Sequence, residues 1–447
     1  MSMKISSMIH LSGPPLAMEL VMYLLLHLRN TEAAAEYLSI LPVLIITLIA
    51  GNVLVSMEKG SSEIWIAANC ILTLGAAVSC LCKSEDGAPF WKLLIFADIA
   101  ALLFFSFFSA DSLIRRLSTR WLSNRVKDSV RKKVTVWTRR ISDYAWILWG
   151  IAALFLLYCM LRYGDKRENT ETITSIEILG EDVQLTEFVK ILAALFYASL
   201  LSGSSKRLSV GARLFWSFVF LAGCFCILYK MQELGTALIL LVLHVLCIFV
   251  FVKTSALKTR LFAAAFILAV FLVLFLLFVY PHLGLESDLI QKVYARFAVW
   301  IITDKTDPSK EGFSINQSIQ SILLGGLFGN ASLSVQLPEA GNDFVYAYII
   351  NHLGLVFGIL VFGLYMLIAI SGLKRVLQLH GFRKVLCFAF SVLFSFQSIY
   401  CMAMNCGFLP VCGIPCSLLS RGGMCLGVSM IMIVYIVLVK SDKEVSI

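Results

Sequence analysis

Charged residues are scarce in this chain: Asp, Glu, Lys and Arg make up only 15% of its 447 residues, whereas 59% of the residues are hydrophobic. With a mean hydropathy of +0.87, the chain holds more apolar sequence than a soluble core of this size could bury. Metal-binding patterns are also lacking, because the six histidines are scattered and no two cysteines have C-x-x-C spacing. Composition therefore excludes an ordinary soluble domain and favours a multi-spanning membrane protein.

Twelve apolar runs are long enough to be membrane spans, which predicts an all-α polytopic fold. The first run is short and is followed by small residues that would suit signal-peptide cleavage, but Glu32 and the next apolar run argue against removal. The expected spans are 16–28, 37–57, 64–82, 90–110, 144–163, 185–201, 212–230, 235–253, 257–281, 344–373, 385–410 and 425–440.

Basic residues gather in loops that twelve spans would place on one side of the membrane. Ten of them lie between Arg115 and Arg140, and both larger segments on the other side, 164–184 and 282–343, carry more acids than bases. The asymmetry predicts cytoplasmic termini and an outward-facing loop 282–343.

The basic stretch 115–140 also carries apolar residues at helical spacing. This pattern is typical of an amphipathic helix that lies on anionic lipids of the inner leaflet. The alternative is a solvated extension of a neighbouring helix.

Two outward-facing positions carry ionisable side chains at the start of apolar runs. Glu187 and Lys190 are three residues apart, so they would share one helix face, either as a structural ion pair or as functional groups. Glu233 lies in a short turn between two spans, where it is either functional or incidental.

Two further sites lie in or beside the long outer loop. Arg296 stands among aromatic residues, where its guanidinium could bind phosphate oxygens or anchor an interfacial helix. Asp343 precedes an apolar run; it could cap the helix that starts at Phe344, or Asn342 could supply the cap and leave Asp343 available for chemistry.

Five short motifs follow one another along the chain. They are Gln184–Lys190, Gln232–Ala237, Gln317–Ser318 with Gly325–Gly329, Leu337–Tyr346 and Gly407–Gly423. In order and composition they resemble the Q-P-S-E-F-x-K, P-D-L-G-T-A, Q-S with G-G-L-F-G, L-P-E-x-H-T-D-F-I-F and G-x-L-P-V-T-G-I-P-L-P-F-I-S-Y-G-G motifs of the SEDS family. This family comprises the FtsW, RodA and SpoVE-like membrane proteins that polymerise peptidoglycan.

The resemblance extends from about residue 64 to the end of the chain and implies a ten-helix core over 64–447. Residues 1–63, with two predicted spans, would be an N-terminal extension. Within the core, 111–143 would form a basic amphipathic cytoplasmic loop and 282–343 a large extracellular loop.

Several positions differ from the family pattern and identify a divergent member. They are Leu185 for Pro, Glu233 for Asp, Gly341-Asn342 for His-Thr, Asn351-His352 for Glu-Glu, and Arg421 for the Tyr of S-Y-G-G.

The resemblance implies a peptidoglycan glycosyltransferase of the bacterial cytoplasmic membrane that polymerises lipid II, a disaccharide-pentapeptide on undecaprenyl pyrophosphate. Asp343 would be the general base, because partial desolvation at the membrane edge brings a carboxyl pKa towards the working pH. Arg296 and Lys190 would neutralise the leaving diphosphate, with magnesium or manganese as a further cation and no organic cofactor.

The remaining motif residues would contact or orient the substrate. Glu187 and Glu339 would orient the cations, and the other substrate-binding candidates are Glu233, Gln317 and Ser318. The resemblance also implies a class B penicillin-binding protein as partner, in addition to anionic lipids, and no nucleic acid.

Two other functions compete with polymerisation. A flippase or transporter for lipid-linked precursors would need a polar path across the bilayer, yet the motif acids gather on one side and no internal repeat is evident. A non-catalytic scaffold for a transpeptidase is supported only by the departures from the family pattern.

Overall fold

The computed structural model describes residues 5–58, 60–82, 90–121, 124–166, 173–178, 181–202, 208–252, 312–330, 337 and 339–439. These residues form 13 helices, which confirms the all-α membrane fold, and a small antiparallel sheet of order β1-β2-β3 that the sequence did not predict. The helices are α1 (Ile5–Arg29), α2 (Thr31–Glu58), α3 (Ser62–Leu81), α4 (Phe90–Trp121), α5 (Asn124–Tyr163), α6 (Leu185–Leu201), α7 (Val210–Met231), α8 (Leu234–Phe251), α11 (Phe313–Gly325), α12 (Val345–Leu353), α13 (Leu355–Val376), α14 (Gly381–Asn405) and α15 (Gly423–Leu438). The strands are β1 (Asp165–Lys166), β2 (Ile173–Ile178) and β3 (Glu181–Val183).

Eight helices in the described part of the chain are long and apolar enough to cross a membrane, so the protein is a multi-pass membrane protein. They are α1, α2, α3, α5, α7, α8, α13 and α14. Helix α15 is apolar but shorter, and α4 and α6 coincide with two other predicted spans. The predicted span 257–281 lies outside the described residues.

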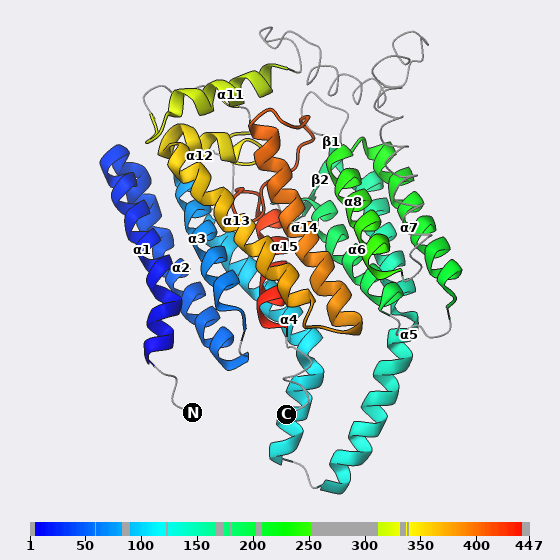
Figure 1. The fold of residues 1–447 in the computed structure, drawn as a ribbon. Coiled ribbons are helices and arrows are strands. Elements are labelled where there is room, and N and C mark those ends of the chain that lie inside the picture. The colour runs from blue at the N-terminus through cyan, green and yellow to red at the C-terminus, as the bar shows by residue number, and fades with distance from the viewer. Residues whose placement is uncertain are drawn as a thin grey trace, which may run out of the picture.

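The two N-terminal helices pack against the other helices of the bundle (Figure 1). Helix α1 contacts α2 and α3, and α2 also contacts α4, where Thr47 Oγ1 donates a hydrogen bond to Asp98 Oδ2 at 2.5 Å. At its C-terminal end, α1 places Arg29 Nη2 2.8 Å from Phe328 O, just beyond α11. The N-terminal helices are therefore joined to the bundle at two levels.

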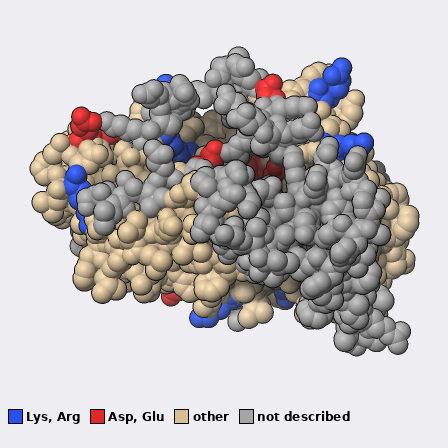
Figure 2. Space-filling view, turned by 90° about the horizontal axis from the view of Figure 1, so that it is seen from above, with Lys and Arg blue, Asp and Glu red and all other residues tan. Residues whose placement is uncertain are grey.

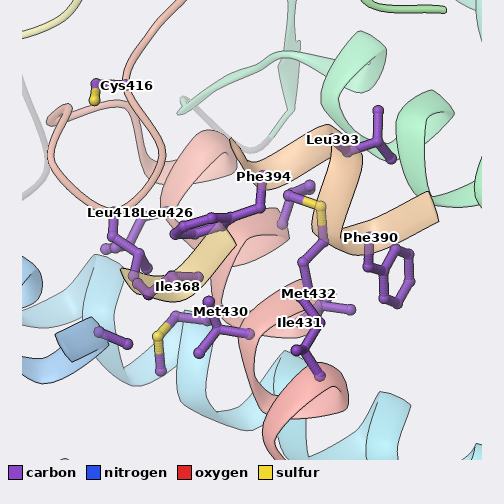
Figure 3. Packing of buried hydrophobic residues seen from close by; sticks show 14 of the residues in the cluster. Ile368, Phe390, Leu393, Phe394, Cys416, Leu418, Leu426, Met430, Ile431 and Met432 are labelled. Carbon is purple, nitrogen blue, oxygen red and sulfur yellow. The ribbon is translucent and has the colours of Figure 1, made fainter. Parts of the chain in front are cut away.

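Helix α15 lies in the centre of the bundle, against α4, α3, α6 and α14. All its residues from Cys425 to Leu438 are buried. Figure 3 shows Met430 of α15 near Ile368 of α13, with Phe394 of α14 in the same buried cluster. A helix enclosed on every side must be apolar all round, which explains why its sequence lacks a polar stripe.

The apolar run 344–373, predicted as one span, is divided into α12 and α13 at Gly354. Gly354 has φ +97°, and a Cβ at this position would lie 2.2 Å from Leu327 O. Only glycine combines this backbone conformation with so close an approach. Helices α11 and α12 lie together at one end of the bundle, and α13 runs from there along it (Figure 1).

The basic stretch 115–140 is divided between two helices instead of forming one. Helix α4 continues to Trp121 and α5 starts at Asn124, and the two extend beyond the bundle at the end opposite α11 and α12 (Figure 1). This arrangement corresponds to the alternative in which the basic stretch extends neighbouring helices instead of forming a separate helix on the membrane surface. The start of α1 and the end of α15 lie at this same end of the bundle.

Candidate active site

Asp343 lies in a turn, residues 339–344, that leads into α12 at the α11–α12 end of the bundle. Asn342 N and Phe344 N both donate to Glu339 O, at 3.0 and 3.3 Å, and Glu339 adopts a positive φ of 51°. The turn is tied to α14 because Asn405 Nδ2 donates to Asp343 O at 2.8 Å. Packing against α14 therefore holds the half-buried Asp343 in place.

The Asp343 carboxylate faces the segment between α14 and α15, residues 406–422, which we call the α14–α15 segment. Asp343 Oδ2 would lie 3.6 Å from a Cβ built on Gly413, whose φ is +62°. A side chain at position 413 would thus be strained by the positive φ, and its Cβ would be in van der Waals contact with the carboxylate. Figure 2, which views this end of the molecule, shows acidic and basic side chains gathered near the middle of the face.

The structure does not show Asp343 as a helix cap. Helix α12 begins at Val345, and Phe344 in the N-cap position makes no capping hydrogen bond with its side chain. The first turn is capped instead from α14, because Asn405 Oδ1 accepts from Ala347 N at 2.9 Å. Asn342, the other predicted cap, donates instead from Nδ2 to Glu339 Oε2 at 3.0 Å. The geometry therefore favours the reading in which Asp343 is held at the site for a reason other than capping.

A second strip of contacts joins the Asp343 turn to the C-terminal end of the α14–α15 segment. Ser420 Oγ donates to Asn342 O at 2.7 Å, and Arg421 N donates to Gly341 O at 2.8 Å. The Asp343 turn is thus fixed from one side by α14 and from the other by residues 420 and 421.

Glu187 and Lys190 form an ion pair in the first turn of α6. Lys190 Nζ lies 2.5 Å from Glu187 Oε1 and 3.0 Å from Gln397 Oε1 of α14. The side chains are almost fully enclosed, with 4% of Glu187 and 1% of Lys190 exposed. The structural ion pair, one of the two readings of this spacing, is therefore the one that the geometry favours.

The buried pair is also connected to the α14–α15 segment. Gln397 Nε2 donates to Pro415 O at 3.0 Å, so one amide joins Lys190 of α6 to the segment that faces Asp343. Glu187 Oε2 is buried without a hydrogen-bond partner among the described residues. The pair is therefore linked to the α14–α15 segment through Gln397.

The other predicted site residues lie around the same segment. Glu233 Oε1 accepts a hydrogen bond from Thr236 Oγ1 at 3.1 Å, at the start of α8. A Cβ on Gly235 would lie 2.6 Å from Cys412 O, so the start of α8 packs directly on the segment. Glu233 is thereby brought to the same end of the bundle as Asp343.

Gln317 and Ser318 lie on α11, which packs on α12. Ser318 Oγ donates to Asn405 O at 2.8 Å, whereas Gln317 is half-buried. Ser318 thus holds α11 on α14. Asn405, which accepts the Ser318 hydrogen bond, is also the residue that donates to Asp343 O. Arg296 lies outside the described residues.

Three positioning residues were missed by reasoning from the sequence: Gln397, Asn405 and Ser420. Gln397 and Asn405 are fully buried amides within the apolar run 385–410. An amide inside a membrane span is costly unless it is hydrogen-bonded, so this was a usable signal. Ser420 carries no comparable signal, because serine is common in loops.

A protein-only metal site is not found in the described residues, where no three His, Cys, Asp or Glu side chains form a group that could hold an ion. Magnesium is commonly held by one or two carboxylates together with substrate phosphates. The divalent cation therefore remains a prediction.

A protein-family model matches residues 130–445, which is well over half of the chain. Its description is cell cycle protein, and it covers the FtsW, RodA and SpoVE proteins.

Curated relatives agree with this match. The chain is 34% identical to the peptidoglycan glycosyltransferase RodA of Treponema pallidum over 139 residues, which is 29% of this chain and 32% of that protein. It is 26% identical to a probable peptidoglycan glycosyltransferase FtsW of Trichlorobacter lovleyi over 306 residues, covering 66% of this chain and 76% of the relative. Stage V sporulation protein E of Bacillus subtilis is 26% identical over 301 residues, covering 63% of this chain and 76% of the relative.

A solved structure has the same fold. It belongs to a peptidoglycan synthase complex described as coordinating polymerization and crosslinking, and it aligns with a TM-score of 0.61. The sequence identity is 19%, and the alignment covers 85% of this chain and 97% of the other.

Proposed function

Because this chain belongs to the FtsW, RodA and SpoVE family of cell cycle proteins, we propose that it is a peptidoglycan glycosyltransferase. Its substrate would be lipid II, which it would polymerise into glycan strands at the outer face of the bacterial cytoplasmic membrane. One observation carries this proposal: a carboxylate, Asp343, is held by α14 and by the α14–α15 segment at the end of a membrane bundle. The relatives named above as RodA and FtsW carry the name of the same activity.

The reaction joins a sugar hydroxyl of the acceptor to the anomeric carbon of the lipid-linked donor strand. The new C–O bond forms as the bond between the anomeric carbon and the diphosphate oxygen breaks, and the electron pair of that bond leaves with the diphosphate. Asp343 would accept the proton of the attacking hydroxyl. The lipid chain would lie along the apolar helices while the sugars remain in water, which explains a carboxylate at this end of the bundle.

The other residues would hold the site in shape or bind substrate. Glu187, Lys190 and Gln397 would maintain the α14–α15 segment, since their contacts are internal. Glu339 would orient the Asp343 turn through Asn342.

The remaining candidates keep the roles that the family resemblance implies. Glu233, Gln317 and Ser318 would line or support the substrate path, and Arg296 would contribute charge to diphosphate binding.

The direct test is polymerisation of labelled lipid II by the purified protein in detergent or nanodiscs. We expect long glycan strands without any added polymerase. Movement of lipid II across a vesicle membrane without polymer would instead support a flippase. Absence of both activities, with retained binding of a transpeptidase, would support a scaffold.

The proposed orientation places both termini in the cytoplasm and α11 and α12 outside. Phe328 and Leu377 are 75% and 76% exposed at opposite ends of the bundle, so a cysteine at either position is accessible. In intact cells, a membrane-impermeant maleimide should label Phe328→Cys, whereas Leu377→Cys should react only after permeabilisation. The reverse pattern would mean that the chain is inserted the other way round.

The basic stretch 115–140 forms the end of α4 and the start of α5. Although these helices extend beyond the bundle, we propose that their basic residues contact anionic headgroups of the inner leaflet. Each basic residue near such a surface contributes about 1 kcal/mol, screened by salt. Replacing Lys132 and Lys133 by Gln in the peptide 115–140 should therefore weaken its binding to anionic vesicles by roughly tenfold or more. Equal binding to neutral and anionic vesicles would contradict the proposal.

A class B penicillin-binding protein is the proposed partner. The solved structure of the same fold comes from a peptidoglycan synthase complex, which supports an assembly of this kind. Affinity purification from native membranes should recover such a protein with this chain, and recovery of the chain alone under mild detergent would count against the partnership.

A further inference from the structure

The leaving diphosphate needs a cation, and the buried pair does not offer a free one. Lys190 is 1% exposed and its ammonium group is already bound to Glu187 and Gln397. A charge that is neutralised and enclosed in this way cannot approach a substrate without breaking the pair. Arg296 lies outside the described residues, so a further candidate is to be found among the described basic residues near Asp343.

Arg421 is placed beside the Asp343 turn by its own backbone. Its amide donates to Gly341 O at 2.8 Å, and the preceding Ser420 Oγ donates to Asn342 O at 2.7 Å. Gly341 and Asp343 are two residues apart, a stretch of chain that spans about 7 Å at most. Arg421 and the proposed base thus belong to two backbone segments that are hydrogen-bonded to each other at the same end of the bundle.

The Arg421 guanidinium has donors to spare. Nη1 donates to Cys82 O, at the end of α3, at 2.7 Å. Within the described part of the chain this is its only side-chain hydrogen bond, and it forms no ion pair there. A guanidinium has five N–H donors in a planar fork that suits phosphate oxygens. The half-buried side chain is therefore anchored at one nitrogen while the rest of its charge remains available.

The surrounding backbone adds positive potential at the same place. Helix α15 starts two residues after Arg421, and Gly422 in its N-cap position leaves the terminus without a side-chain cap. Residues 421 to 424 are all partly exposed. The N-terminus of a 16-residue helix carries a partial positive charge and unpaired N–H groups, which reinforces a neighbouring guanidinium in binding an anion.

We propose that Arg421 binds the diphosphate of the lipid-linked substrate and stabilises it as it leaves. In this role, the guanidinium neutralises the charge that develops on the diphosphate oxygen when its bond to the anomeric carbon breaks. The acceptor proton goes to Asp343, on the other side of that carbon. The assignment rests on the proposed glycosyltransferase function, and it gives a purpose to one of the departures from the family pattern, which has Tyr at this position.

The test measures binding of undecaprenyl diphosphate to the full-length protein in nanodiscs, together with kcat/KM for lipid II. In Arg421→Gln, the amide keeps a donor for Cys82 O but has no charge. Losing a hydrogen bond from a charged group should weaken undecaprenyl diphosphate binding and lower kcat/KM by about 10- to 100-fold, with little change in Tm. Arg421→Lys keeps the charge but lacks the planar fork, so its diphosphate binding and its kcat/KM should lie between those of the wild type and of Arg421→Gln.

Arg29→Gln is the matched control, because Arg29 lies at the same end of the bundle and also donates to a single backbone carbonyl. It should leave both quantities within about twofold of the wild type, as surface changes usually do. A folded Arg421→Gln protein with unchanged diphosphate binding would overturn the assignment. So would equal losses in Arg421→Gln and Arg421→Lys together with a lowered Tm, the pattern of a purely structural residue.

A measurement on the unmodified protein covers the case in which both variants fail to fold. Undecaprenyl diphosphate should protect Arg421, but not Arg29, from modification by phenylglyoxal, and lack of protection would overturn the assignment. Failure of the proposed function would be distinguishable from failure of this assignment. A wild-type protein that binds undecaprenyl diphosphate through Arg421 but makes no glycan would support the binding site and contradict the polymerase function.

Discussion

Replacing Asp343 by Asn is expected to reduce glycan polymerisation by about two to four orders of magnitude, the usual contribution of a general base. The substitution removes the proton acceptor but keeps the shape of the side chain. The contact that holds this residue, Asn405 Nδ2 to Asp343 O, involves only the backbone oxygen and is unaffected. Initial rates with labelled lipid II, compared at equal amounts of folded protein, measure the effect.

Measurements of unfolding stability distinguish a general base from a helix cap at position 343. An Asp that capped α12 would tolerate Asn and would lose about 0.5 to 2 kcal/mol of stability on replacement by Ala. Because Asn405 Oδ1 accepts from Ala347 N in the first turn of α12, we expect Asp343→Asn and Asp343→Ala to unfold at similar denaturant concentrations and both to be inactive. A fully active Asp343→Asn protein would remove this carboxylate from the mechanism.

Replacing Lys190 by Met should lower the free energy of unfolding by about 3 to 5 kcal/mol, the cost of leaving one partner of a buried pair uncompensated. Glu187 is 4% exposed, so its carboxylate would be enclosed without its cation, and Gln397 would lose a donor. Denaturant titration of the protein in detergent, followed by tryptophan fluorescence, measures the loss.

A double variant shows whether the loss of stability comes from the unpaired Glu187 charge or from the loss of the Lys190 side chain itself. Adding Glu187→Gln to Lys190→Met removes the unpaired charge and should recover most of the lost stability. Lys230→Met, at an exposed position near the end of α7, is the matched control and should change stability by less than about 0.5 kcal/mol. If Lys190→Met were as stable as this control, the buried pair would not be what holds the site together.

Much of the architecture follows from the sequence alone. Long apolar runs predict the membrane helices, because lipid requires every spanning segment to satisfy its backbone internally. The order of the five motifs was enough to identify the family, and Asp343 was recognisable as a carboxylate at the start of an apolar run. These are local properties, so a single sequence reports them.

Only the tertiary structure decided how these parts meet. The break between α12 and α13 depends on Leu327, whose carbonyl approaches Gly354 too closely for any side chain. Hydropathy does not reveal this break, because the apolar residues continue on both sides of Gly354. Likewise, the spacing of Glu187 and Lys190 left a structural and a functional reading open, and Gln397, 207 residues from Lys190, favours the first.

The place of Arg421 has the same origin. In the sequence it is a single departure from a family motif, far from Asp343 along the chain. In the fold its amide binds Gly341 O, because the α14–α15 segment packs against the turn before α12. Hydropathy and motif spacing describe the solvent preference of each residue and its neighbours in sequence. The site is made by contacts between segments distant in sequence, which form only when the helices pack.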